Sequence, residues 1–113
     1  MSHQAVALGE VLAARARVGE RYHEFLRVPA LSAGVYVLPV GGSDPQTPHT
    51  EDEVYYVARG RAMLQVGGVD VPVSPESVVY VPARVAHRFH SITEELSVLV
   101  FFAPAEGSEG GAC

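Results

Sequence analysis

Residues 46–60, QTPHTEDEVYYVARG, decide how the rest of the chain is interpreted. The stretch begins with a polar, proline-containing segment and ends in an apolar, aromatic run that is typical of a β-strand. Side chains of an extended strand alternate between its two faces, so His49, Glu53 and Tyr55 are predicted to share one face. A lone carboxylate on an apolar face is costly to bury. Glu53 therefore needs a metal ion or a cationic partner beside it.

The sequence on both sides of this stretch predicts a series of short β-strands. Apolar, β-branched and aromatic runs alternate with glycine- and proline-rich breaks. The Gly67-Gly68 pair predicts a two-residue hairpin turn, because both residues can adopt a positive φ. Eight strands at this spacing predict an all-β sandwich or barrel. The expected strands are 21–28, 32–40, 53–58, 62–66, 69–73, 77–82, 87–92 and 96–103.

The two ends of the chain differ from this pattern. Residues 5–18 are alanine-rich with apolar residues near helical spacing, and Gly19 is a suitable residue to end a helix. Residues 105–113 contain almost no large apolar side chain and are expected to form a disordered tail. We therefore expect an N-terminal helix or extension at 1–19, a β-barrel domain at 20–104, and the tail.

Composition restricts the classes of function. A chain of 113 residues is long enough for one domain with a real core. Its net charge of −5 and lack of a basic cluster argue against nucleic-acid binding. We expect no signal peptide and no membrane-spanning segment, and hence a cytoplasmic protein. The single cysteine, Cys113, excludes an internal disulfide.

A second histidine lies at the start of a later predicted strand. Alternation places Phe89 and Ser91 on the face of His87, with Arg88 and His90 opposite, so His90 is interpreted as structural. Tyr55 is a candidate catalytic proton donor together with Glu53, because the two share a strand face.

Residues 41–60 resemble the first conserved motif of the cupin family. Gly41, His49, Glu53 and Gly60 fit its spacing, whereas Thr47 stands where the family has its first histidine. In the second motif, Pro82 and His87 match with the right spacing. Three residues depart from that second motif, where the family has two glycines and an asparagine: Glu76, Arg84 and Ser91.

The resemblance covers roughly residues 20–104 and implies a cupin-type double-stranded β-helix, or jelly-roll barrel. Cupins typically hold one divalent metal ion inside this barrel, and the matching positions here are His49, Glu53 and His87. Two imidazoles and one carboxylate suit iron, manganese, nickel or zinc. The missing ligand position is open to the side-chain oxygen of Gln46, to Thr47, or to water. Gln46 is reachable only if the prolines on either side of it break the strand alternation.

The resemblance also implies a function for the barrel. The first expectation is a metal-dependent enzyme acting on a small molecule, with dioxygenase chemistry as the commonest precedent. The alternative is a non-catalytic module that binds a small ligand with or without metal. A homodimer is expected as well, because residues 21–28 form an edge strand and small cupins commonly pair through such strands.

Overall fold

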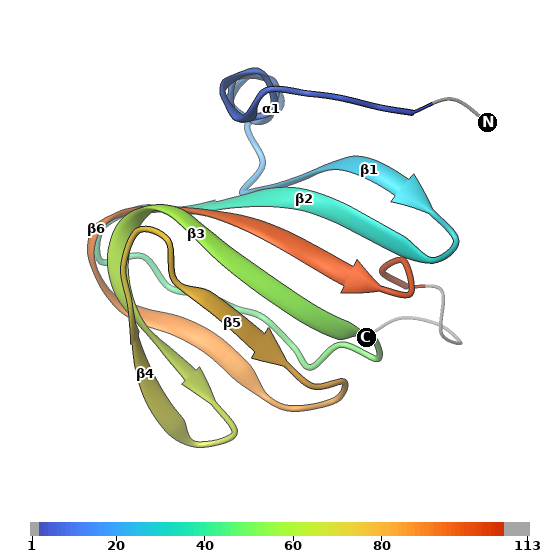
Figure 1. Cartoon of the computed structure of the whole chain (residues 1–113). Helices are drawn as coiled ribbons and strands as arrows, with labels where there is room; N and C mark the ends of the chain where they lie inside the picture. The colour runs from blue at the N-terminus through green and yellow to red at the C-terminus, as the bar shows by residue number, and fades with distance from the viewer. Residues whose placement is uncertain (1–2, 108–113) are drawn as a thin grey trace.

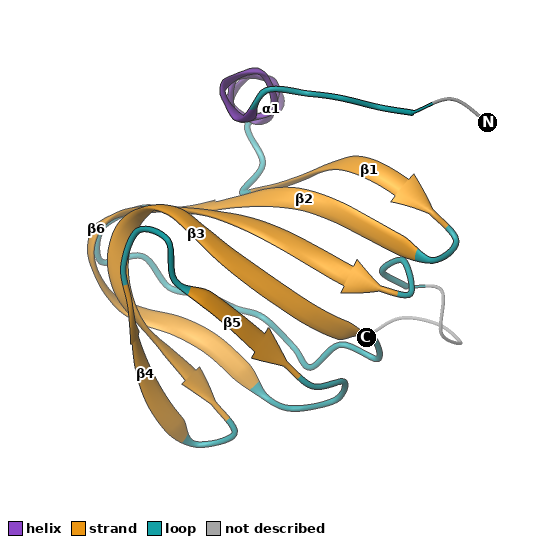
Figure 2. Ribbon diagram, viewed as in Figure 1, coloured by secondary structure: helices purple, strands orange, loops and turns teal. Residues whose placement is uncertain are grey.

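The computed structural model describes residues 3–107, which form one antiparallel β-sheet with a short helix before it (Figures 1 and 2). The sheet has six strands in the order β1-β2-β6-β3-β4, and β5 pairs with β3. This order has two ends, so the sheet curls as a jelly roll without closing into a complete ring of hydrogen bonds. The predicted all-β fold with an N-terminal helix is confirmed. The elements are α1 (Leu8–Val18), β1 (Tyr22–Val28), β2 (Leu31–Leu38), β3 (Asp52–Val66), β4 (Val69–Val73), β5 (Val78–Val81) and β6 (His87–Ala103).

The strand count differs from the prediction because two pairs of predicted strands are continuous. Segments 53–58 and 62–66 both belong to β3, and segments 87–92 and 96–103 both belong to β6. These two long strands pair with each other along most of their length, with register shifts between Val57 and Met63. The eight predicted strands are therefore six in the structure. The predicted breaks at 59–61 and 93–95 are irregularities within a continuous hydrogen-bonded ladder.

In each long strand, the alternation of buried and exposed positions shifts by one residue part-way along the strand. In β3, the buried positions before Gly60 are odd-numbered and those after it are even-numbered. Gly60 has a φ of 96°, and Ser91 of β6, which has a φ of 51°, lies at a similar change. Ile92 is buried there and Ser91 is exposed, so the prediction that Ser91 shares the face of His87 is wrong. A left-handed residue breaks the strict alternation of an extended strand.

Three non-glycine residues adopt left-handed backbone geometry. Glu76, Arg84 and Ser91 have φ values of 77°, 68° and 51°, and all three are exposed. They are the positions at which the resembled motif has glycine or asparagine, the residues that adopt this geometry most easily. The turns of the second motif are therefore retained although their usual residues are not.

The N-terminal helix packs over β1 and β2 (Figure 1). Gly19 ends it in the predicted left-handed conformation, with a φ of 83°, and its N–H donates to the carbonyl of Arg15. Gly67 and Gly68 likewise both have positive φ and form the predicted hairpin turn. No helix in the described part of the chain has both the length and the apolar character needed to cross a bilayer.

The interior of the curled sheet holds a continuous apolar core. Its largest fully buried residues include Leu38, Tyr55, Val57, Leu64, Phe89, Leu96 and Val98.

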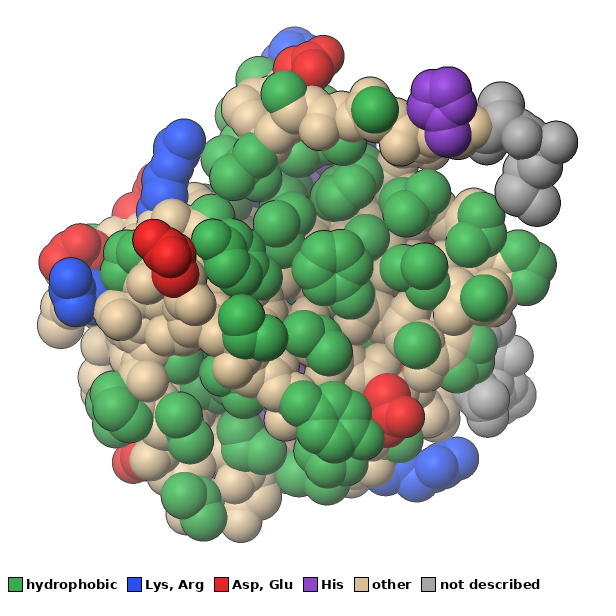
Figure 3. All heavy atoms as spheres, in the orientation of Figure 1, with side chains coloured by type: hydrophobic (Ala, Val, Ile, Leu, Met, Phe, Trp, Pro, Cys, Tyr) green, Lys and Arg blue, Asp and Glu red, His purple; other side chains and the backbone are tan. Residues whose placement is uncertain are grey.

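The outer surface of the molecule is also partly apolar. Figure 3 shows hydrophobic side chains over much of one face, with charged side chains mostly toward its rim. Among the strands within residues 3–107, β1 pairs with β2 alone. These features agree with the expected homodimer, which stays a prediction.

Candidate metal centre

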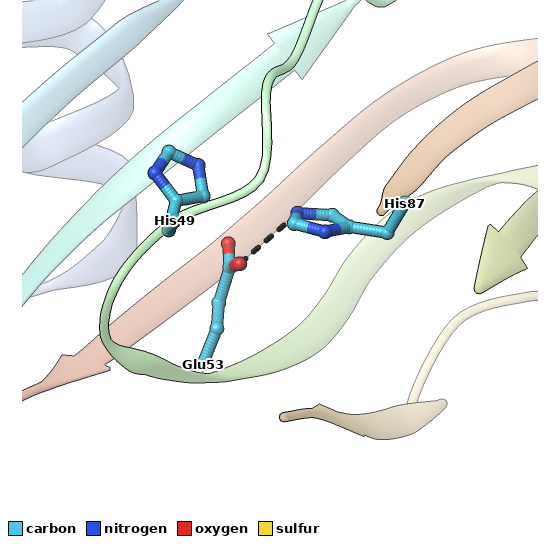
Figure 4. Close-up of side chains that lie close together, drawn as sticks. All are labelled: His49, Glu53 and His87. Atoms are coloured by element: carbon cyan, nitrogen blue, oxygen red, sulfur yellow. Dashed lines mark ion pairs between the residues drawn. The ribbon is translucent and has the colours of Figure 1, made fainter. Parts of the chain in front are cut away.

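Two histidines and a glutamate converge inside the curled sheet (Figure 4). His49 comes from the loop before β3, Glu53 from the start of β3, and His87 from the start of β6. Each offers one ligand atom, and these atoms all lie within 4.8 Å of one another. The side chains of Glu53 and His87 are almost fully buried, whereas that of His49 is 14% exposed. The structure thus brings together the three residues selected from the sequence.

The backbone explains why these side chains meet. Glu53 lies on the buried face of β3, as alternation predicts, together with Tyr55 and Val57. The N–H of Arg84 donates to the carbonyl oxygen of His49 at 2.6 Å, which ties the loop of the first motif to the loop of the second. The second loop leads directly into His87, so this hydrogen bond helps to position the two histidine-bearing segments relative to each other.

The tautomer of His87 follows from its neighbours. Its Nδ1 lies 2.8 Å from the carbonyl oxygen of Val85, which can only accept, so Nδ1 carries a proton. The lone pair of the neutral imidazole is therefore on Nε2, which lies 3.1 Å from Oε1 of Glu53. Burial alone lowers the pKa of His87, but Glu53 and the Val85 carbonyl raise it above its ordinary value. Burial lowers the pKa of His49, which favours its neutral, metal-binding form.

Gln46 lies at the same centre. Its Nε2 donates to Oδ2 of Asp44 at 2.6 Å, and a carboxylate can only accept, so the amide orientation is determined. Its Oε1 therefore faces inward, 3.2 Å from Nε2 of His87. Thr47 is exposed, so of the two side chains considered for the missing ligand position only Gln46 is beside the cluster.

More acceptor atoms than donors gather at this centre, where the Tyr55 hydroxyl is a donor to Gln46 Oε1 alone. Nε2 of neutral His87, Oε1 of Gln46 and the carboxylate of Glu53 all offer lone pairs, and neither Glu53 oxygen has a well-aligned hydrogen bond within residues 3–107. A buried carboxylate left in this state is strongly destabilising. A cation resolves the conflict, either as a proton on His87 or as a metal ion bound by the cluster.

Tyr55 is buried behind this cluster and is already engaged. Its hydroxyl donates to Oε1 of Gln46 at 3.0 Å. Burial, with the nearby charge of Glu53, holds the pKa of Tyr55 well above its usual value, so the hydroxyl stays neutral. In this structure Tyr55 orients Gln46, and its expected role as a catalytic proton donor stays a prediction.

Asp44 supports the centre and was not selected from the sequence. It is buried and accepts hydrogen bonds from the Tyr36 hydroxyl at 2.5 Å, from the Gln46 amide, and from the backbone N–H of Phe89 at 2.8 Å. These contacts link β2, the loop before β3, and β6. The GGSDPQTP segment reads as a polar loop, and nothing in that pattern distinguishes a buried aspartate from an exposed one.

Replacing Asp44 with asparagine should lower the free energy of unfolding by about 1–3 kcal/mol, because one of three buried donors would then face an NH₂ group. Urea denaturation of wild type and Asp44→Asn measures the difference. Asp52→Asn is the matched control, since Asp52 is an exposed aspartate that likewise accepts hydrogen bonds, two in number. An equal loss in both variants would contradict the supporting role of Asp44.

The first residues of the predicted tail make defined contacts beside the centre. Ala105 is buried, the Glu106 N–H donates to Oγ of Ser32 at 2.9 Å, and the Gly107 N–H donates to Oε2 of Glu51 at 3.1 Å. Glu51 thus anchors this segment, whereas Glu53 joins the histidines, as the spacing predicts. Residues 105–107 therefore differ from the expected disordered tail, and residues 108–113 lie outside the described part of the chain.

Glu106 is the second residue near the centre that sequence analysis missed. Its Oε2 lies 3.7 Å from Nδ1 of His49, a position that a carboxylate often occupies beside a metal-binding histidine. Burial raises the pKa of Glu106, and the carboxylates of Glu24, Glu51 and Glu53 add to the shift. An acid in a glycine-rich terminal segment gives no sequence signal for such a role.

A small cavity of about 160 Å³ opens beside the cluster. Its lining includes Gln46, His49, Glu53 and Tyr55, and aromatic and aliphatic side chains form most of the remainder. A small molecule in this cavity would therefore contact the converging side chains directly.

Comparison with known proteins agrees with this architecture. The model of the cupin domain family matches residues 34–103. A Streptomyces coelicolor protein described as uncharacterized is 50% identical over 103 residues, covering 91% of this chain and 98% of that protein. An RmlC-like cupin from Shewanella frigidimarina superposes with a TM-score of 0.68 at 21% identity, covering 74% of this chain and 75% of that one.

A more distant structure shows the same fold in a longer chain. The cupin domain of Schizosaccharomyces pombe Cnp3 has a TM-score of 0.67 at 16% identity, and the match covers 74% of this chain and 63% of that one. At these identities the solved structures establish the fold alone, while the family model spans both conserved motifs. With the jelly-roll sheet, the two motif turns and the paired histidines in place, this chain belongs to the cupin domain family.

Proposed function

We propose that this cupin binds one divalent metal ion through His49, Glu53 and His87, with Oε1 of Gln46 as a further ligand. The observation that carries the proposal is the convergence of the two imidazoles and the Gln46 amide oxygen on the buried Glu53 carboxylate, whose oxygens lack a hydrogen-bond donor within residues 3–107. Mixed imidazole, carboxylate and amide ligands suit iron(II), manganese, nickel or zinc. Proteins keep such arrangements of buried lone pairs where a cation occupies them.

The proposed activity is a metal-dependent reaction of a small molecule in the adjoining cavity, with dioxygenase chemistry as the precedent among cupins. A bound ion of this kind supplies Lewis-acid or redox chemistry to a substrate. Asp44 and Tyr55 hold the Gln46 amide in one orientation, and the aromatic walls limit the access of water. The neutral hydroxyl of Tyr55 and the carboxylate of Glu53 are the groups placed to hold a proton.

Metal analysis is the direct test. Protein reconstituted in turn with iron(II), manganese, nickel and zinc, then desalted, should retain about one equivalent of at least one of them. Less than about 0.1 equivalent of every metal would refute the proposal. Substrate-dependent oxygen uptake by the iron(II) form distinguishes a dioxygenase from a binding module, which would show only a ligand-linked rise in melting temperature.

Gln46→Leu should weaken metal binding by roughly tenfold, because it removes one oxygen from the ligand set while it nearly preserves side-chain volume. A competition titration against a chromophoric chelator measures the affinity. Thr47→Val is the matched control, since Thr47 is the neighbouring alternative and is exposed. If Thr47→Val weakened binding as much as Gln46→Leu, the assignment of Gln46 would be wrong.

A further inference from the structure

The walls of the cavity suit a small planar molecule. Tyr22, Tyr36 and Phe102 contribute aromatic rings, and Val100 adds an aliphatic surface. The rings of Tyr22 and Phe102 meet edge to face, with centroids 6.4 Å apart, so this wall is a packed aromatic surface. An apolar cavity of roughly 150 Å³ is enough to hold benzene, and this one measures about 160 Å³. The fit is to a single ring with a small substituent.

No arginine or lysine side chain lines the cavity among the described residues. The two nearby arginines are both engaged at the surface. Arg21 donates to the carbonyl oxygen of Ser43, and Arg27 donates to the backbone of Glu106 and pairs with Glu24. A carboxylate or phosphate on a ligand would therefore find no guanidinium or ammonium group to bind it.

Glu106 instead places a negative charge at the cavity. Its side chain is 31% exposed and lines the cavity together with His49. The backbone around it is fixed by hydrogen bonds from Arg27 to the Glu106 carbonyl and from the Glu106 N–H to Ser32. The backbone of Glu106 is thus held next to the ligand space, so its carboxylate stays near the cavity, where it repels anions.

Tyr22 offers an unused polar group. Its hydroxyl is buried, and it has no hydrogen-bond partner among residues 3–107. The ring lies against Gly34, where an added Cβ would be only 2.4 Å from the phenol oxygen, so the ring position depends on that glycine. A buried hydroxyl without a partner gains a hydrogen bond when a ligand presents an acceptor.

We propose that the cavity binds a small, planar, uncharged or cationic ring compound, and that Glu106 is the residue that discriminates against anionic ones. This inference rests on the proposed function, because the cavity adjoins the proposed metal ligands. It adds the class of ligand and a specificity-determining residue. Nothing in it depends on which metal is bound.

The test uses benzamide, benzamidine and benzoate, which share a ring and shape but differ in charge. Ligand-observed NMR titrations give dissociation constants for the metal-free protein and for the protein loaded with zinc, which is redox-inactive. We expect benzoate to bind about tenfold or more weakly than benzamide in the metal-free form, and a zinc ion beside the cavity should reduce this difference, because it attracts the carboxylate. Equal or tighter binding of benzoate in the metal-free form, or no binding of any of the three in that form, would overturn the inference.

Glu106→Gln should reduce the preference for benzamide over benzoate by at least about threefold, because it removes the charge but keeps the shape. Glu94→Gln is the matched control, since Glu94 is an exposed acid paired with Arg61 on the surface, and it should leave the preference unchanged. An unchanged preference in Glu106→Gln would contradict the role of this residue. Zinc content, measured on the same samples, reports on the proposed metal site separately, because the metal-free titrations do not depend on it.

Discussion

Replacing His87 with alanine should abolish metal binding. His87 is the most enclosed of the imidazoles in the cluster, and its tautomer is fixed with Nε2 toward Glu53 and Gln46. Alanine leaves one imidazole, one carboxylate and the amide oxygen of Gln46, and an amide oxygen is too weak a donor to hold a stable site of this type with only two stronger ligands. After reconstitution and desalting, elemental analysis should find about one equivalent of metal in the wild type and less than about 0.1 in His87→Ala.

His90→Ala is the matched control for this loss. His90 lies on the same strand, but it pairs with Asp70 on the outer surface. A melting curve adds an independent measurement, since metal at a hundredfold excess over its dissociation constant adds about 2.7 kcal/mol of stability. That corresponds to a rise of the order of 10 °C for a domain of this size. The rise should occur in wild type and His90→Ala and be absent in His87→Ala. Equal metal content in the two variants would refute the assignment.

Among the described glycines, Gly60 should be the one whose replacement by alanine destabilises the fold most. A Cβ at this position would lie 2.2 Å from the carbonyl oxygen of Glu95 and 2.7 Å from Cα of Leu96. Both contacts are with the backbone of β6, which is held in the ladder with β3 and cannot easily move aside. The φ of 96° adds strain for any residue with a side chain. Together these effects should lower the free energy of unfolding by about 3–5 kcal/mol.

Two further glycines separate the causes of that loss. Gly68 has a φ of 87° with nothing within 4 Å of an added Cβ, so Gly68→Ala reports the backbone strain alone, about 1–2 kcal/mol. Gly9 lies in α1 with open space around it, and Gly9→Ala should stabilise the helix slightly. Urea denaturation of the three variants gives the order. If Gly60→Ala and Gly68→Ala lost the same stability, close packing against β6 would not be the reason for Gly60.

The sequence predicted the fold well where strands are regular. Alternation placed Glu53, Tyr55 and Val57 on the buried face, and the structure agrees. It failed at Ser91, because a residue with positive φ changes which positions face inward, and a serine gives no sign of that conformation. It also divided the long strands, since it cannot tell a bulge within a ladder from a turn that ends one.

The candidate site was predictable to the extent that motif spacing determines it. His49, Glu53 and His87 could be selected because each lies at or near the start of a strand and matches the spacing of a known motif. The sequence could not show whether Gln46 or Thr47 occupies the missing ligand position, because that depends on the hydrogen bond from Gln46 to Asp44. That bond in turn depends on the path of a loop with two prolines, which is a property of the folded chain.

The exposed left-handed turns at Glu76 and Arg84 have a consequence for how this surface can diverge. A side chain there adds backbone strain of about 1–2 kcal/mol, and the neighbouring strands hold the turn in place regardless. Position 84 also ties its loop to His49 through a backbone N–H, a bond that any residue except proline can make. Charge and shape at the rim can therefore change during evolution, and with them the molecules that approach, while the buried histidines keep their places.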